Sequence, residues 1–169
     1  MQTKSHVIMN VEEIPAGSLL YCPELGDGIL CIAANYHGHP GRSSMLIPLS
    51  GVAKYNFAFQ TIRVENLSER VVLTEGFRAE VDLSSTTNLD HATAHVAKDG
   101  TYIRLRSERP VIGMRQCLRL EDGIIYSYPP MASVGFTRWW IASEDDPNEV
   151  LWDSATIENQ ISMEAQHGR

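Results

Sequence analysis

Residues 94–105 read Ala-His-Val-Ala-Lys-Asp-Gly-Thr-Tyr-Ile-Arg-Leu, and this stretch decides the fold class. The Asp-Gly pair at its centre suits the two positive-φ positions of a type I′ turn, which joins antiparallel strands without splaying them. A two-residue turn at Asp99 and Gly100 pairs Lys98 with Thr101 and each preceding residue with its counterpart on the second strand. One face then carries Ala94, Val96, Ile103 and Leu105, and the other carries His95, Ala97, Tyr102 and Arg104. The first set is apolar and the second largely polar, so the stretch predicts an amphipathic β-hairpin.

A helix over residues 89–98 competes with this hairpin. Such a helix would end at Gly100 and would place His91 and His95 one turn apart on the same face. We favour the hairpin, because its pleat sorts polar from apolar side chains on both strands at once.

Tight turns and alternating side chains recur along the whole chain. Asp-Gly also occurs at 27–28 and 122–123, each time before a β-rich run. Alternation, or enrichment in β-branched and aromatic residues, predicts strands at 7–11, 18–22, 28–33, 45–49, 55–61, 70–74, 77–83, 111–120, 124–128 and 134–141. About ten short strands separated by Gly, Pro, Asn and Asp indicate an all-β protein, built as an antiparallel β-sandwich or a partly closed barrel.

The chain fits a single β-rich domain. Its 169 residues suffice for one packed core and are few for two, and no Pro- or Ser-rich linker divides residues 1–169. Near the C-terminus, Asp146-Pro147-Asn148-Glu149 has the order of an N-cap, a first-turn proline and a capping-box glutamate. Residues 146–165 are therefore expected to form a short C-terminal helix. The alternative is a short strand at 150–152 followed by a polar tail.

Composition limits the partners and the compartment. The formal net charge is −7, which argues against nucleic-acid binding, because a basic surface supplies most of that affinity. The longest uncharged apolar runs are far shorter than the ~20 residues of a membrane span, and no signal peptide is visible. The 3 cysteines lack CxxC spacing and are typical of reduced thiols in a cytoplasmic protein. No nucleotide-binding motif is present, and we expect no cofactor.

The loop after the strand at 28–33 carries two histidines, His37 and His39. Their i, i+2 spacing in a β-rich chain resembles the metal-binding HxH element of cupins, which makes them candidate metal ligands. That element also needs both histidines on one strand face and a glutamate soon after. Here a Pro-Gly pair interrupts the strand, and the next acidic residue is Glu65. His91 or a remote carboxylate would have to complete the site; the competing interpretation is a solvated turn.

The second strand of the hairpin supplies the candidate binding residues Tyr102, Arg104 and Arg106, which project from one face. A cationic, aromatic face suits a carboxylate, a phosphate or an acidic protein surface. The alternative is an ordinary exposed sheet face, paired by cross-strand charges with the strand at 77–83. Trp139 joins the candidates because Trp is favoured at binding hot spots, although a large aromatic in a β-protein more often belongs to the core.

The sequence contains no coherent catalytic motif, because nucleophile elbows and phosphate-binding glycine loops are absent. We therefore expect a non-enzymatic β-rich module that binds or assembles through protein–protein surfaces, with a protein partner or by self-association. A structural subunit of a larger particle falls within this class. The alternative is a cupin-like metal-dependent enzyme or small-molecule binder that uses the His37 and His39 loop.

Overall fold

The computed structural model describes residues 7–10, 13–25, 29–38, 44–50, 59–64, 70–73, 76–106, 115–146 and 148–155. These residues are mostly strand, which confirms the predicted all-β class. The strands are β1 (Val7–Asn10), β2 (Leu19–Tyr21), β3 (Leu30–Tyr36), β4 (Met45–Pro48), β5 (Ile62–Arg63), β6 (Arg70–Leu73), β7 (Phe77–Val81), β8 (Thr86–Thr87), β9 (Ala94–Ala97), β10 (Gly100–Arg104), β11 (Cys117–Arg119), β12 (Ile124–Tyr126), β13 (Ser133–Phe136), β14 (Trp139–Ser143) and β15 (Val150–Asp153). Helical structure in the described ranges is limited to short turns such as η2 (Pro23–Leu25) and η4 (Leu83–Ser85). In this part of the chain no helix has the length and apolarity of a membrane span.

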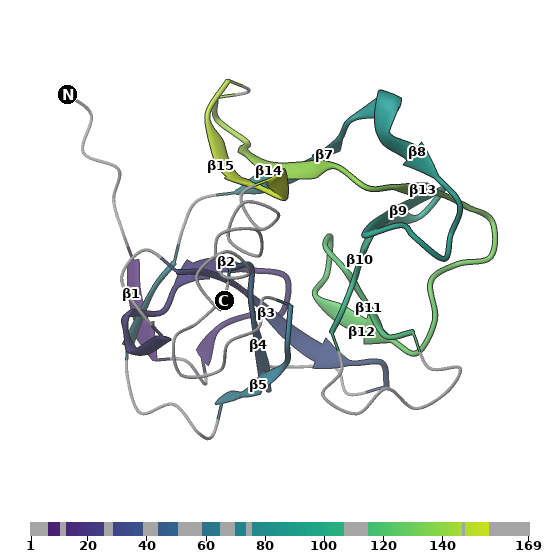
Figure 1. The fold of residues 1–169 in the computed structure, drawn as a ribbon. Coiled ribbons are helices and arrows are strands. Elements are labelled where there is room, and N and C mark those ends of the chain that lie inside the picture. Colours follow the sequence, from purple (N-terminus) through teal and green to yellow (C-terminus); the bar gives the residue numbers. More distant parts are fainter. Residues whose placement is uncertain are drawn as a thin grey trace, which may run out of the picture.

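The strands form two sheets (Figure 1). A 12-stranded sheet has the order β1-β6-β2-β3-β12-β11-β10-β9-β13-β8, with β4 paired to β3 and β5 paired to β4. A 3-stranded sheet has the order β15-β14-β7. The described strand pairs are antiparallel, apart from β3 and β12, which run parallel. These strands do not close into a barrel.

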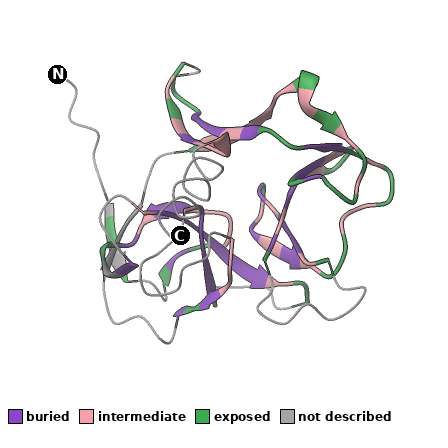
Figure 2. Cartoon of the chain, in the orientation of Figure 1, coloured by how far each residue is buried: buried purple, intermediate pink, exposed green. Residues whose placement is uncertain are grey.

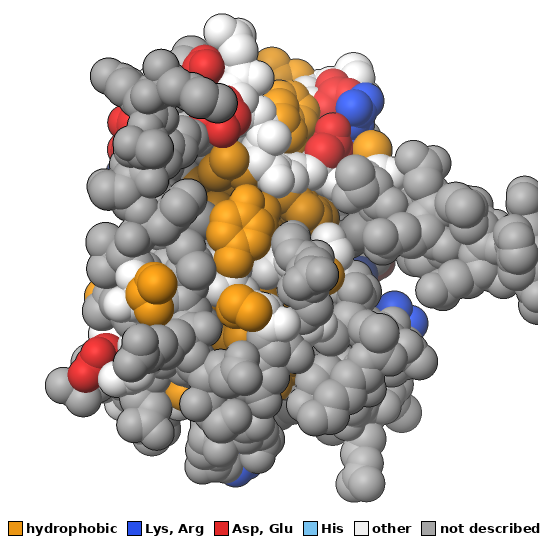
Figure 3. All heavy atoms as spheres, turned by 90° about the vertical axis from the view of Figure 1, so that its left-hand side faces the viewer, with side chains coloured by type: hydrophobic (Ala, Val, Ile, Leu, Met, Phe, Trp, Pro, Cys, Tyr) orange, Lys and Arg blue, Asp and Glu red, His pale blue; other side chains and the backbone are white. Residues whose placement is uncertain are grey.

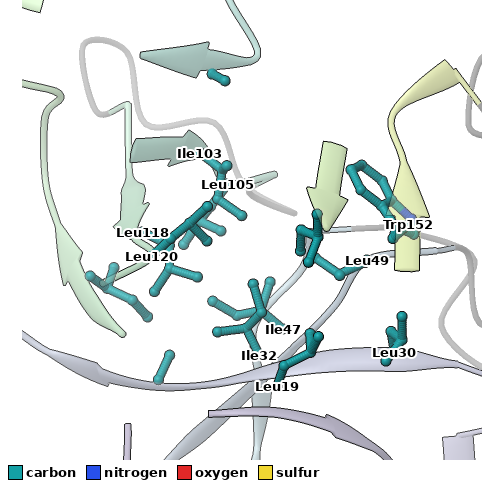
Figure 4. Packing of buried hydrophobic residues seen from close by; sticks show 14 of the residues in the cluster. Leu19, Leu30, Ile32, Ile47, Leu49, Ile103, Leu105, Leu118, Leu120 and Trp152 are labelled. Carbon is teal, nitrogen blue, oxygen red and sulfur yellow. The ribbon is translucent and has the colours of Figure 1, made fainter. Parts of the chain in front are cut away.

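A hydrophobic core joins the two sheets. Figure 4 shows side chains of β2 to β4 and of β10 and β11 pointing toward one another, with Trp152 of β15 beside them. The rings of Trp139 and Trp152 lie 4.6 Å apart between centroids, and Phe59 packs against both. Exposed residues lie outside this core, for example along the rim around β8 (Figure 2). The 3-stranded sheet is therefore held to the 12-stranded one by aromatic and aliphatic packing.

A second apolar cluster covers the opposite face of β3. Its buried residues are Ile14, Leu20, Cys22, Leu25, Cys31, Ala33, Leu46, Ile62 and Val64. Because β3 is buried on both faces, it reads in the sequence as a continuous apolar run and shows no alternation. This strand extends to Tyr36, beyond the predicted 28–33.

Most of the other predicted strands have a described counterpart. The predictions at 7–11, 18–22, 45–49, 70–74, 77–83 and 124–128 correspond to β1, β2, β4, β6, β7 and β12. Residues 55–58 and 111–114, which belong to two further predicted strands, lie outside the described residues. Local alternation therefore located strands well in the described part of the chain.

The central hairpin is present, but each residue of β9 pairs two residues earlier along β10 than predicted. Ala97 pairs with Gly100, so the turn residues are Lys98 and Asp99. Gly100 begins β10 with a φ of 148°, and a Cβ there would overlap the carboxylate of Glu121. The missing side chain at Gly100 therefore leaves room for Glu121, which lies in the turn between β11 and β12. The shift preserves side-chain parity, so the predicted core face and polar face are both retained.

The predicted strand at 134–141 is two strands in different sheets. β13 pairs with β8 and β9, whereas β14 pairs with β7 and β15. Between them, the backbone N–H of Thr137 donates to Ser85 O at 3.1 Å, and that of Arg138 donates to Ser85 Oγ at 3.0 Å. These two hydrogen bonds turn the chain from one sheet toward the other.

The C-terminal segment begins as the strand β15, in agreement with the alternative at 150–152. Residues 156–165 of the expected helix lie outside the described residues. Asp146, the predicted N-cap, lies in a turn. Its side chain accepts a hydrogen bond from the backbone N–H of Asn148 at 2.9 Å, and its backbone carbonyl accepts one from the N–H of Glu149 at 3.0 Å. An N-cap and an Asx-turn use the same side-chain-to-backbone bond, so the residue types alone do not separate them.

Candidate functional site

The described residues do not complete the predicted metal site. His37 is exposed in the turn after β3, with its ring 5.0 Å from that of Tyr126. His39 lies outside the described residues. His91 is exposed in the turn before β9, and its backbone N–H bonds to Asn88. No group of three or more His, Cys, Asp or Glu among the described residues could hold a metal ion. The metal site stays a prediction.

Tyr102 is buried, although it was expected on a binding surface. Only 2% of the residue is exposed, and its hydroxyl donates to Asp99 Oδ2 at 2.8 Å. Burial, with the hydrogen bond to Asp99, raises its pKa to about 12. Tyr102 therefore closes the β9–β10 turn and keeps its proton over the usual pH range.

The predicted arginines are partly committed to internal contacts. Arg104 Nη1 donates to the Asp90 carbonyl at 2.8 Å, and Arg115 forms an ion pair with the Asp90 carboxylate. Arg106 is exposed, and its backbone N–H donates to Phe59 O at 3.0 Å. The alternative pairing of these arginines with the strand at 77–83 is wrong, because β7 lies in the other sheet. Arg104 holds the turn before β9 against β10.

Trp139 belongs to the core, and the structure corrects its expected place at a surface. It is 1% exposed and packs against Phe59 and Trp152. Its neighbour Trp140 is half-buried, and its Nε1 donates to Glu80 Oε2 at 3.1 Å. Alternation predicts that the two indoles point to opposite sides, but it does not say which side another layer covers.

A polar cluster surrounds Tyr102 on the face opposite the core. Arg119 Nε donates to Asp122 Oδ1 at 3.0 Å, and its guanidinium lies 5.4 Å from the Tyr126 ring centroid. The hydrogen bond to Asp122 raises the pKa of Arg119. Burial pushes the pKa of Asp122 upward, but hydrogen bonds from Arg119 and from the Ile124 N–H outweigh it and lower that pKa. The cluster ties β11 to β12 and leaves these charges internally matched.

The nucleophilic side chains of this face are poorly placed for chemistry. Burial lowers the pKa of His95 and the charges of Arg104 and Arg115 lower it further, while its Nδ1 has no hydrogen-bond partner among the described residues. Burial raises the pKa of Cys117 to about 12, and also raises that of Cys31. A buried thiol that stays protonated is a weak nucleophile. These residues therefore act as structural groups.

A cleft of about 410 Å³ opens between the two sheets, where sequence reasoning placed no site. This volume falls within the range of about 300–1,000 Å³ that is usual for ligand pockets. Its walls are the start of β2, the first half of β7, the β11–β12 turn and the end of β14. The lining residues are Gly17, Ser18, Leu19, Gly76, Phe77, Arg78, Ala79, Leu120, Glu121 and Glu144.

One wall of this cleft is the edge of β7 that faces away from β14. Among the described strands, only β14 pairs with β7. Glu144 N–H donates to Gly76 O, and Asp82 N–H donates to Arg138 O, both at 3.0 Å. Backbone groups alternate between the two edges of an antiparallel strand, so the intervening residues direct their N–H and C=O away from β14. The residues of this outer edge are Phe77, Ala79 and Val81.

Comparison with models of known protein families, with curated proteins and with solved structures gives no match for this chain. The candidate site therefore rests on its geometry. Alternation at 77–83 located the strand, but its open edge depends on which distant strands pair with it.

Proposed function

We propose that this protein is a non-enzymatic β-rich module that acts through protein–protein surfaces, and that the β7 cleft is one of them. The observation that supports the proposal is the outer edge of β7, whose backbone groups open onto a cleft of about 410 Å³. An extended segment of another chain can add to such an edge and complete the hydrogen-bond ladder.

Two further features agree with this role. Figure 3 shows a face on which hydrophobic side chains gather in the middle, with acidic and basic side chains near the top. Apolar surface bordered by polar groups is typical of protein-binding faces. The cysteines Cys22, Cys31 and Cys117 are buried and free, which supports a cytoplasmic location. In architecture we propose a partly open β-sandwich, with the small sheet packed on the large one.

Backbone pairing alone would bind weakly. Phe77 and Ala79 offer two N–H and two C=O groups to the cleft. At about 1 kcal/mol net for each hydrogen bond, four bonds contribute about 4 kcal/mol. Association itself costs at least about 4 kcal/mol, so side chains of the partner must add to the affinity.

Selection of a displayed library of random twelve-residue peptides on the immobilised full chain tests the proposal. Selected peptides should shift the backbone amide signals of Phe77 and Ala79 in NMR spectra of the full chain. N-methylation of the peptide residues that face β7 should abolish binding, whereas N-methylation of the intervening residues should leave it intact, since only the first set donates to the edge. Failure to select any peptide, or amide shifts confined to other strands, would contradict the proposal.

A further inference from the structure

We propose that the segment occupying the β7 cleft is an extended basic peptide, with a Lys or Arg side chain lying between Glu121 and Glu144. This inference rests on the proposed function, because it names the chemistry of the partner for the same cleft. It follows from the charges of the lining residues and from where their hydrogen bonds already go.

Glu144 follows β14 and lines the cleft beside Gly76, the residue before β7. Its backbone N–H donates to Gly76 O at 3.0 Å, and a Cβ at Gly76 would overlap the Glu144 carboxylate. The absent side chain at Gly76 therefore lets this carboxylate lie over the first residue before β7. Glu144 is exposed and forms no ion pair with another described residue.

Glu121 belongs to the facing wall, in the β11–β12 turn. Its Oε1 accepts the backbone N–H of Thr101 at 2.8 Å, which orients the carboxylate. A carboxylate has about four acceptor positions, so one bond leaves capacity for a cation. Glu121 is exposed, and within the described part of the chain it makes no ion pair.

Arg78 is the basic side chain among the described lining residues, and its charge is already balanced. Its Nε lies 2.6 Å from Glu80 Oε1, and its Nη1 donates to Ser143 O at 3.5 Å. The cleft is therefore left with the negative charges of Glu121 and Glu144. A basic side chain in an approaching strand neutralises them, whereas an acidic one is repelled.

The same charge argues against a second copy of this chain as the occupant. The formal net charge of −7 makes two copies repel each other, and a basic segment is attracted by that same charge. A basic peptide is thus the occupant that the electrostatics favour.

Three synthetic peptides of seven residues test the inference. Each alternates Thr and Val and carries a central Lys, Gln or Glu, and binding to the full chain is measured by fluorescence anisotropy at low and high salt. An exposed ion pair contributes between about 1.4-fold and about fivefold in affinity. At about threefold for each of the two glutamates, the Lys peptide should bind about tenfold more tightly than the Gln peptide at low salt. The Glu peptide should bind more weakly than either, and high salt should reduce the differences.

Glu144→Gln and Asp145→Asn form a matched pair of variants. The two residues are adjacent, both exposed, and each change removes one negative charge, but only Glu144 lines the cleft. Glu144→Gln should weaken the Lys peptide about threefold and leave the Gln peptide unchanged, whereas Asp145→Asn should change either by less than about twofold. Equal effects of the two variants would overturn the placement of the basic side chain.

The outcomes separate the inference from the function on which it rests. Equal affinities for the Lys and Gln peptides, with amide shifts at β7 in both, would overturn the basic partner and keep the strand-addition site. Absence of any β7 shift with all three peptides would overturn both. A dimer in analytical ultracentrifugation that competes with the Lys peptide for β7 would replace the basic peptide with a second copy.

Discussion

Gly38 and Gly123 provide a matched test of how closely the β11–β12 turn packs against residues 16–17 and Ala33. Both residues have positive φ, 88° and 67° respectively. A Cβ at Gly38 would meet no atom of the described residues within 4 Å. A Cβ at Gly123 would overlap Gly17 N and would lie 2.5 Å from Ala33 O and 2.8 Å from Ala16 C. Replacement by alanine therefore causes backbone strain alone at the first site, and strain with a clash at the second.

The expected losses of unfolding free energy differ by about 2 kcal/mol. Left-handed backbone costs an alanine about 1 kcal/mol at either site. At Gly123 the clashing atoms are backbone atoms, which cannot rotate aside as a side chain can. Overpacking of this kind adds about 1–3 kcal/mol, so we expect about 1 kcal/mol for Gly38→Ala and about 3 kcal/mol for Gly123→Ala.

Urea denaturation followed by circular dichroism measures both losses on the full chain. The denaturation midpoint of Gly123→Ala should fall well below that of Gly38→Ala, with similar slopes if the denatured ensembles are alike. Free energies within about 0.5 kcal/mol of each other would refute the reasoning, because they would mean that the backbones near Gly123 separate at little cost.

Three further predictions test the core, the buried histidine and the turn. Trp139→Phe should lower the free energy of unfolding by about 2 kcal/mol, because buried carbon atoms are lost. Trp140→Phe should lower it by about 1 kcal/mol or less, because it loses one half-exposed hydrogen bond. Equal urea midpoints for the two variants would contradict this order. His95 has a lowered pKa in the folded chain, so the unfolded chain binds the extra proton below its ordinary pKa of about 6.5. Stability should fall from pH 7.5 to pH 5.5 more steeply in the wild type than in His95→Gln, and equal falls would count against the assignment. Tyr102→Phe should cost about 1 kcal/mol through loss of the bond to Asp99 and should remove the tyrosine that ionises near pH 12 in an ultraviolet titration.

Local pattern predicted much of the fold because strands and tight turns leave short-range signals. Alternation in residues 94–105 assigned each side chain to the correct face, even though the predicted register was wrong by two residues along β10. At Gly100 the missing side chain leaves space for the Glu121 carboxylate, a contact between residues far apart in the chain. The break after Phe136 is likewise accompanied by hydrogen bonds from Thr137 and Arg138 to the distant Ser85. Contacts of this kind leave no mark in a window of ten residues.

The candidate site was less predictable than the fold. Tyr102 was a binding candidate because it shares a strand face with two arginines, and Trp139 because Trp is favoured at binding hot spots, yet both are buried. Charge pattern indicated which strand face was polar, but not which polar groups satisfy one another. The β7 cleft needs four separate segments of the chain to meet, and its acidic residue Glu121 had no distinguishing sequence context.

The parallel pairing of β3 with β12 has a consequence for synthesis of the chain. Figure 1 shows β3 reaching from the N-terminal strands toward β12. Asn35 pairs with Ile124, which follows it by about 90 residues in the chain. The backbone N–H of Asn35 also donates to Gly123 O at 2.8 Å. On the ribosome, the end of β3 therefore emerges long before the strand that will cover it. Until then the backbone groups at Asn35 and Tyr36 lack their partners in β12, so the growing chain presents an unpaired strand end that is prone to association with other chains.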